Sequence, residues 1–127
     1  MDKKILLVED NREYIDMLKT ILSEHGYQVI TAHNGEDGLE ILKKDASSID
    51  IIITDLHMPG ISGLELAKEI FLQKITEAPI VILTTETSSQ MKKEGTQAGI
   101  HHWIIKPIKK EIFLGTVDLI FKRYCQN

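Results

Sequence analysis

Five short apolar runs, separated by longer segments with helical spacing, limit most strongly how this chain can fold. The runs cover residues 5–8, 27–32, 49–53, 80–83 and 103–105, and most of them are rich in Ile, Val and Leu. Continuous runs of this kind are typical of strands that are buried on both faces of a sheet. Strands that alternate with helices predict a parallel sheet covered by helices on both faces.

The intervening segments carry apolar residues at intervals of three and four, as amphipathic helices do. The clearest sets are Tyr14, Leu18, Ile21 and Leu22; Leu64, Ala67, Ile70 and Phe71; and Ile112, Thr116, Leu119 and Ile120. Residues 36–44 predict a shorter helix with Asn34 as its N-cap and with Leu39 and Leu42 facing inward. Residues 88–98 predict the weakest helix, because Gly95 interrupts them. We therefore predict an α/β fold of the flavodoxin-like kind, a five-stranded doubly wound parallel sheet of order 2-1-3-4-5 with five helices.

Composition limits the class of protein further. Of the 127 residues, 43% are hydrophobic and 27% are charged, which suits a single domain over 1–127 without an output domain. The net charge of −4 disfavours nonspecific binding of nucleic acid, which depends on neutralising phosphates. We expect no membrane insertion and no secretory leader, because the apolar runs are short and residues 1–4 lead directly into a strand. The single cysteine, Cys125, has no partner for an internal disulfide, so we expect a reducing, cytoplasmic location.

Carboxylates stand where the first and third predicted strands end. Glu9 and Asp10 follow the first strand, and Asp55 follows the third. These strands are neighbours in the predicted order, and ligands of such sheets bind beyond the carboxyl ends of the strands, where the order reverses. Three converging carboxylates repel one another and raise each other's pKa, so such clusters usually hold a cation. Hard oxygen ligands with room left for water favour Mg²⁺.

A hydroxyl and an ammonium are predicted at the same edge of the sheet. Thr84 ends the fourth strand, and Lys106 precedes Pro107, which lacks an N–H and stops the fifth strand. An ammonium suits one phosphoryl oxygen, and a hydroxyl donor suits another. With the carboxylates, these groups indicate a phosphoryl site in which an aspartate carries the group as an acyl phosphate. The transfer then depends mainly on positioning and on neutralising charge.

In this order and at this spacing, the motifs resemble the receiver domain of two-component response regulators over essentially the whole chain. They are Glu9-Asp10; Asp55 with Met58-Pro59 and Gly63; Thr84; and Lys106-Pro107. The resemblance implies that Asp55 accepts a phosphoryl group from a phosphohistidine. It also implies that Asp10 and Asp55, with Glu9 and the backbone carbonyl of His57, hold Mg²⁺.

The resemblance assigns roles to further residues around this site. Lys106 and Thr84 would bind the phosphoryl oxygens. Trp103 takes the place of an aromatic that changes rotamer when the threonine moves, although it also fits a half-buried packing position. His57 and Glu86 stand two residues after Asp55 and Thr84, where the family tunes hydrolysis of the acyl phosphate.

A finer likeness points to the chemotaxis branch, the CheY proteins. It lies in residues 84–88 and 103–107, with Lys92, Gly95 and Ala98-Gly99. Receivers outside chemotaxis share these residues, so a phosphorelay of another kind stays open. The chain departs from the common pattern at Ser62 and Ile108. His101 and His102 are not expected to share a metal, because neighbouring strand residues point to opposite faces.

The resemblance implies a stand-alone, monomeric signalling protein and not an enzyme, since it would catalyse only its own phosphorylation and hydrolysis. The implied partners are a sensor histidine kinase or phosphotransfer domain and a downstream protein, which the chemotaxis likeness suggests is a flagellar motor switch. The surface offered to that protein would be the fourth helix, the last strand and the last helix. No nucleic acid is implied.

Other classes fit the residues less well. A haloacid-dehalogenase-like phosphatase needs a second Asp two residues after its nucleophile, where this chain has His57. A flavin-binding electron carrier needs a phosphate loop after the first strand, where Glu9 and Asp10 would repel phosphate. A P-loop nucleotide hydrolase is excluded by the missing Gly-rich Lys motif. A pseudo-receiver that only mediates contacts is the remaining alternative, and the complete set of acids, Thr and Lys argues against it.

Overall fold

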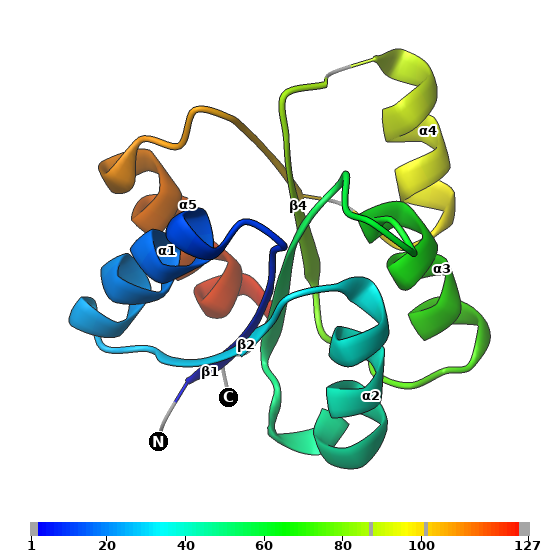
Figure 1. The fold of residues 1–127 in the computed structure, drawn as a ribbon, viewed down its shortest axis with the longest axis horizontal. Helices are drawn as coiled ribbons and strands as arrows, with labels where there is room; N and C mark the ends of the chain where they lie inside the picture. The colour runs from blue at the N-terminus through cyan, green and yellow to red at the C-terminus, as the bar shows by residue number, and fades with distance from the viewer. Residues whose placement is uncertain (1–2, 87, 101, 125–127) are drawn as a thin grey trace.

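One sheet of five parallel strands forms the centre of the protein in a computed structural model, which describes residues 3–86, 88–100 and 102–124 (Figure 1). The strands are β1 (Lys4–Val8), β2 (Gln28–Ala32), β3 (Ile51–Asp55), β4 (Ile80–Thr84) and β5 (His102–Ile105). Their order in the sheet is β2-β1-β3-β4-β5. The predicted fold class and strand order are therefore confirmed.

Helices cover both faces of this sheet. They are α1 (Arg12–Glu24), α2 (Gly35–Asp45), α3 (Gly63–Leu72), α4 (Ser89–Gln97) and α5 (Lys110–Tyr124), with a short 3₁₀ turn, η1 (Ala46–Ser48), after α2. Figure 1 shows α1 and α5 together on one side and α2, α3 and α4 on the other. None of the helices within the described ranges is both long and apolar enough to cross a membrane.

The strands are buried on both faces, which explains why they appear as continuous apolar runs. In β1, Ile5 and Leu7 pack with α1 and α5, whereas Leu6 and Val8 pack with α2 and α3. The same alternation holds in β3 and β4. Each of these four β1 side chains is 0% exposed, so burial contributes about 1.5–3 kcal/mol for each one.

Polar caps start the helices in the loops that follow the strand ends. Asn34 accepts a hydrogen bond from the amide of Asp37 at 2.7 Å, which confirms the predicted cap of α2. Asn11 caps α1 through the amide of Tyr14 at 3.0 Å. The Ser62 hydroxyl accepts from the Glu65 amide, and the Glu65 carboxylate accepts from the Ser62 amide, in a capping box at α3. Each cap fixes the residue at which its helix begins.

Two details differ from the prediction. The third strand begins at Ile51 and ends at Asp55, whereas 49–53 was predicted, because Ile49 is buried just before the sheet pairing starts. The predicted helical positions Phe71, Ile112 and Leu119 face solvent, with 60%, 61% and 56% exposure. The buried stripe of α5 consists of Phe113, Val117, Ile120 and Phe121, so Ile120 is buried as predicted.

At the opposite end of the sheet, a hydrogen-bonded cluster ties α1 and β2 to α5. Asp118 accepts hydrogen bonds from the hydroxyl of Tyr27 and from Nε2 of His25, the latter at 2.9 Å. Tyr27 also stacks on Phe121, with ring centroids 4.8 Å apart. Partial burial acts to raise the pKa of Asp118, but the hydrogen bonds from Tyr27 and His25 outweigh it and lower the pKa below its ordinary value.

Replacing Tyr27 with phenylalanine is expected to lower the free energy of unfolding at pH 7 by about 1 kcal/mol, since one hydrogen bond to a half-exposed carboxylate is lost. The lowered pKa of Asp118 means that its contribution is present above its ordinary value of 3.8 and is lost as the pH falls through the folded-state pKa. Urea denaturation of both proteins at pH 7 and pH 3 should show the difference shrink at the lower pH. An equal difference at both values would contradict the role given to Asp118.

Candidate functional site

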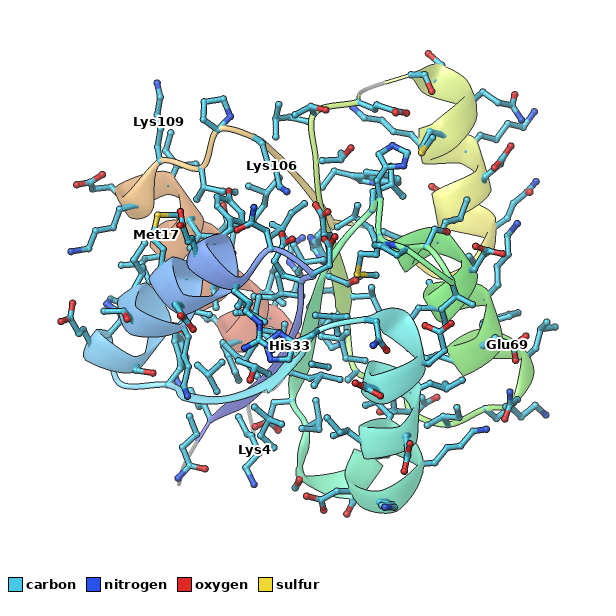
Figure 2. The ribbon with its side chains drawn as sticks, in the orientation of Figure 1. Lys4, Met17, His33, Glu69, Lys106 and Lys109 are labelled. Carbon is cyan, nitrogen blue, oxygen red and sulfur yellow. The ribbon has the colours of Figure 1, made fainter. Side chains whose placement is uncertain are left out.

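The strand ends bring the predicted site residues to one edge of the sheet. Glu9 follows β1, Asp55 ends β3, Thr84 ends β4 and Lys106 follows β5. The backbone continues the sheet bonding there, since the Lys106 amide donates to the Thr84 carbonyl at 2.9 Å. Figure 2 shows the Lys106 side chain pointing inward from the segment between β5 and α5.

Three carboxylates meet at this edge. One oxygen each from Glu9, Asp10 and Asp55 lies within 4.8 Å of the others. Glu9 is 1% exposed and Asp55 is 8% exposed, whereas Asp10 lies open to solvent. The amide of Asn11 donates to Oε2 of Glu9 at 3.0 Å and so fixes that carboxylate. The arrangement is a shallow acidic site with two inner carboxylates and one outer one.

Lys106 partly balances this negative charge. Its Nζ lies 2.6 Å from Oδ1 of Asp55 and 3.4 Å from Oε1 of Glu9. Burial acts to lower the pKa of Lys106, but the hydrogen bond and charge of Asp55, with the charge of Glu9, raise it above its ordinary value. The side chain is therefore an ammonium at neutral pH and places one positive charge against three carboxylates.

The pKa of Glu9 lies above its ordinary value. Burial raises this pKa, and the charge of Asp55 adds to the rise. The amide of Asn11 and the ammonium of Lys106 act in the opposite direction but do not cancel it. A divalent cation would relieve the repulsion, and carboxylate oxygens are the hard ligands that Mg²⁺ prefers. The residues present therefore fit the predicted metal.

Thr84 is 2% exposed and is held by its own loop. Its Oγ1 accepts a hydrogen bond from the amide of Glu86 at 2.9 Å. This bond uses a lone pair of the oxygen and not the hydroxyl proton. The hydroxyl keeps its capacity to donate while the loop fixes its position.

His57 and Glu86 form an ion pair or hydrogen bond that the sequence did not predict. Nε2 of His57 lies 2.6 Å from Oε1 of Glu86, which joins the loop after β3 to the loop after β4. Both side chains are well exposed. Their equal spacing, two residues beyond Asp55 and Thr84, was the signal that could have suggested the pair.

Trp103 is half-buried and packs on the core between the sheet and α4. A Cβ added at Gly95 would lie 2.4 Å from Cζ2 of the indole, so this glycine leaves room for the ring. The helix α4 runs unbroken through Gly95, so the predicted helix is confirmed although it contains this glycine. The observed position matches the packing interpretation of Trp103, whereas its change of rotamer stays a prediction.

Sequence reasoning missed two neighbours of the site. The ring of Tyr14, which was assigned only a helical apolar position, has the Lys106 ammonium 4.6 Å from its centroid. Gly63 was noted only as a motif residue, but a Cβ there would lie 2.4 Å from the carbonyl oxygen of Asp55. The expectations for His101 and Cys125 concern residues outside the described ranges.

Comparison with known proteins agrees with this geometry. The family model for the response regulator receiver domain matches residues 5–118. The chain belongs to the response regulator receiver family. The predicted resemblance is confirmed by a match that covers the site and all of the sheet except Lys4.

Individual relatives extend the comparison. Protein PilH of Pseudomonas aeruginosa is 30% identical to this receiver over 118 residues, which are 92% of the chain and 96% of PilH. The uncharacterized transcriptional regulatory protein YrkP of Bacillus subtilis is 36% identical over 124 residues, 98% of the chain, but the match spans only 52% of YrkP. A structure of the chemotaxis protein CheY4 of Vibrio cholerae aligns with a TM-score of 0.88 at 35% identity, covering 94% of this chain and 99% of that one. The receiver is thus CheY-like in structure.

Proposed function

We propose that this receiver is a phosphorylation switch in which Asp55 accepts a phosphoryl group from a phosphohistidine of a sensor histidine kinase or phosphotransfer domain. An oxygen of Asp55 forms a bond to phosphorus, and the phosphorus–nitrogen bond of the donor breaks with its electron pair going to the imidazole. The observation that carries this proposal is the nearly buried Asp55 carboxylate, held 2.6 Å from the Lys106 ammonium beside two other acids.

The surrounding residues would neutralise and orient the charge that develops. Asp10, Asp55 and Glu9, with the backbone carbonyl of His57, would hold Mg²⁺, which supplies positive charge to the phosphoryl oxygens when bound. Lys106 would move from the Asp55 carboxylate to a phosphoryl oxygen. Positioning and charge neutralisation account for most of the catalysis of phosphoryl transfer, so these groups suffice without a separate acid or base. The receiver would act only on itself and would not be an enzyme for another substrate.

The signal would leave through protein contact. We propose a cytoplasmic monomer with a single domain over 1–127, which offers α4, β5 and α5 to a downstream protein. Ile105 and Ile112 expose 43% and 61% of their surface on that side and give it apolar character. The likeness to a chemotaxis protein supports a target of the motor-switch kind, and a phosphorelay outside chemotaxis is the alternative.

The test is intact mass after incubation with acetyl phosphate, with Mg²⁺ and with excess EDTA. We expect one added phosphoryl group with Mg²⁺ and none with EDTA, because the acidic site needs its cation. Asp55→Asn should take up none, whereas Asp16→Asn, on the exposed face of α1, should behave as the unaltered protein. No adduct under any condition, with hydrolysis shown to be slow, would favour a pseudo-receiver.

The pair His57–Glu86 is expected to slow loss of the phosphoryl group, because it links the two loops beside Asp55. His57→Ala and Glu86→Ala should each speed dephosphorylation by about twofold to fivefold, the effect of an exposed pair worth up to about 1 kcal/mol. The rate is measured as loss of the phosphoryl mass after the donor is removed. Glu40→Ala, in an exposed pair on α2, is the control. If both site variants keep the original rate, the two residues do not set the lifetime.

A further inference from the structure

The ring of Tyr14 makes a second contact with the ammonium of Lys106. The Nζ atom lies 4.6 Å from the centroid of the Tyr14 ring and 2.6 Å from Oδ1 of Asp55. Tyr14 stands in the first turn of α1, where its amide donates to Oδ1 of the cap residue Asn11 at 3.0 Å. The amide of Asn11 in turn donates to Glu9. The ring is therefore held by the same short segment that holds the buried acid.

The contact between the Tyr14 ring and the Lys106 ammonium restrains a side chain that is otherwise flexible. Its ammonium is a compact, strongly hydrated charge on a flexible four-carbon chain. The attraction between the Lys106 ammonium and the Asp55 carboxylate weakens when the carboxylate becomes an acyl phosphate. The carboxylate loses its own negative charge when one of its oxygens bonds to phosphorus. The face of an aromatic ring attracts a cation whether or not Asp55 is phosphorylated. We propose that Tyr14 is a positioning residue that keeps the Lys106 ammonium in the site while it passes from the carboxylate to the phosphoryl oxygen.

The ring face, and not the phenol oxygen, carries this role. The Tyr14 hydroxyl is buried near the backbone of Ile108, on the segment after β5, and has no hydrogen-bond partner among the described residues. Burial and the charges of Glu9 and Asp55 act to raise the pKa of Tyr14, so the phenol is neutral at physiological pH. Phenylalanine should therefore replace tyrosine here, whereas leucine, with similar bulk and no aromatic face, should not.

The first test compares initial rates of phosphorylation by acetyl phosphate with Mg²⁺, in which the Asp55 oxygen displaces acetate from phosphorus. This comparison rests on the proposed function. Tyr14→Leu should be slower by about fivefold, and Tyr14→Phe should stay within about twofold of the unaltered protein. In a Lys106→Met background, Tyr14→Leu should have no further effect, because the cation is absent. Met17→Leu, one turn along α1 (Figure 2), is the control for packing of that helix.

A second measurement does not depend on phosphorylation. Ring current should shift the Lys106 Cε protons upfield in the unphosphorylated protein, and the shift should persist in Tyr14→Phe and vanish in Tyr14→Leu. Absence of this shift, equal rates for Tyr14→Leu and the unaltered protein, or equal slowing by Tyr14→Phe and Tyr14→Leu would each overturn the positioning role. An unaltered protein that shows the ring-current shift but accepts no phosphoryl group would instead contradict the proposed function.

Discussion

Replacing Gly63 with alanine is expected to abolish phosphorylation of Asp55 and to lower the free energy of unfolding by about 3 kcal/mol, the upper part of the usual range for overpacking. The added Cβ would lie 2.4 Å from the carbonyl oxygen of Asp55 and 3.2 Å from Cα of Leu56. Both are backbone atoms, so no side chain can rotate away. The Gly63 amide also donates a hydrogen bond to the Leu56 carbonyl at 2.8 Å. The Leu56 amide in turn donates a hydrogen bond to the Leu83 carbonyl at 3.0 Å. The clash must therefore move the end of β3 that carries Asp55.

Urea denaturation and the intact-mass assay together check this expectation. Gly115→Ala is the matched control, because Gly115 is an exposed helical glycine with nothing within 4 Å of an added Cβ. That variant should gain about 0.5–1 kcal/mol from helix propensity and keep its phosphorylation. If Gly63→Ala were as stable as the unaltered protein and were phosphorylated normally, the backbone around Asp55 would tolerate a Cβ at this position.

The two glycines show which parts of the site a sequence can predict. The sheet and the meeting of Glu9, Asp10 and Asp55 follow from strand order, because carboxyl ends of neighbouring parallel strands share one edge. The need for Gly63 depends on a distance between backbone atoms of β3 and α3, which no local pattern records. In the sequence, Gly63 stood out only as part of the receiver-family motif.

Helical spacing was also an incomplete guide to which side chains meet. It placed Tyr14 among core positions, whereas the first turn of α1 starts at the site edge and turns this ring toward Lys106. In α5 the apolar residues outnumber those that the sheet can cover, so Ile112 and Leu119 fitted the spacing and still face solvent. The partner of each helix face is set by the three-dimensional packing and not by periodicity alone.

Gly95→Ala is expected to push the indole of Trp103 out of its place and to lower the free energy of unfolding by up to about 2 kcal/mol. Two effects oppose each other at this position. Alanine is favoured over glycine within a helix by about 1 kcal/mol. The new Cβ, however, would lie 2.4 Å from Cζ2 of the indole, and overpacking of this kind costs about 1–3 kcal/mol. Of the nine residues of α4, all of which the structure describes, Gly95 is the buried one, so little else anchors the helix there.

Trp103 is the single tryptophan of the chain, so its fluorescence reports on this site alone. In Gly95→Ala we expect the emission to shift to longer wavelength and quenching by acrylamide to increase, because the ring becomes more exposed. Gly115→Ala, again the control, should leave both unchanged. If Gly95→Ala gained stability and kept the original emission, α4 would have moved away from the ring at no cost.

The same variant bears on the predicted change of rotamer of Trp103. If phosphorylation moves the indole out of contact with α4, the unphosphorylated Gly95→Ala protein should already resemble the phosphorylated form in its emission, and acetyl phosphate should change it little. A packing role alone predicts instead that phosphorylation leaves the emission of the unaltered protein unchanged. Because α4 has few apolar contacts, it is the element that a shift of this ring could release most easily. If phosphorylation of Asp55 does move this ring, the contact between Gly95 and Trp103 is where α4 would loosen.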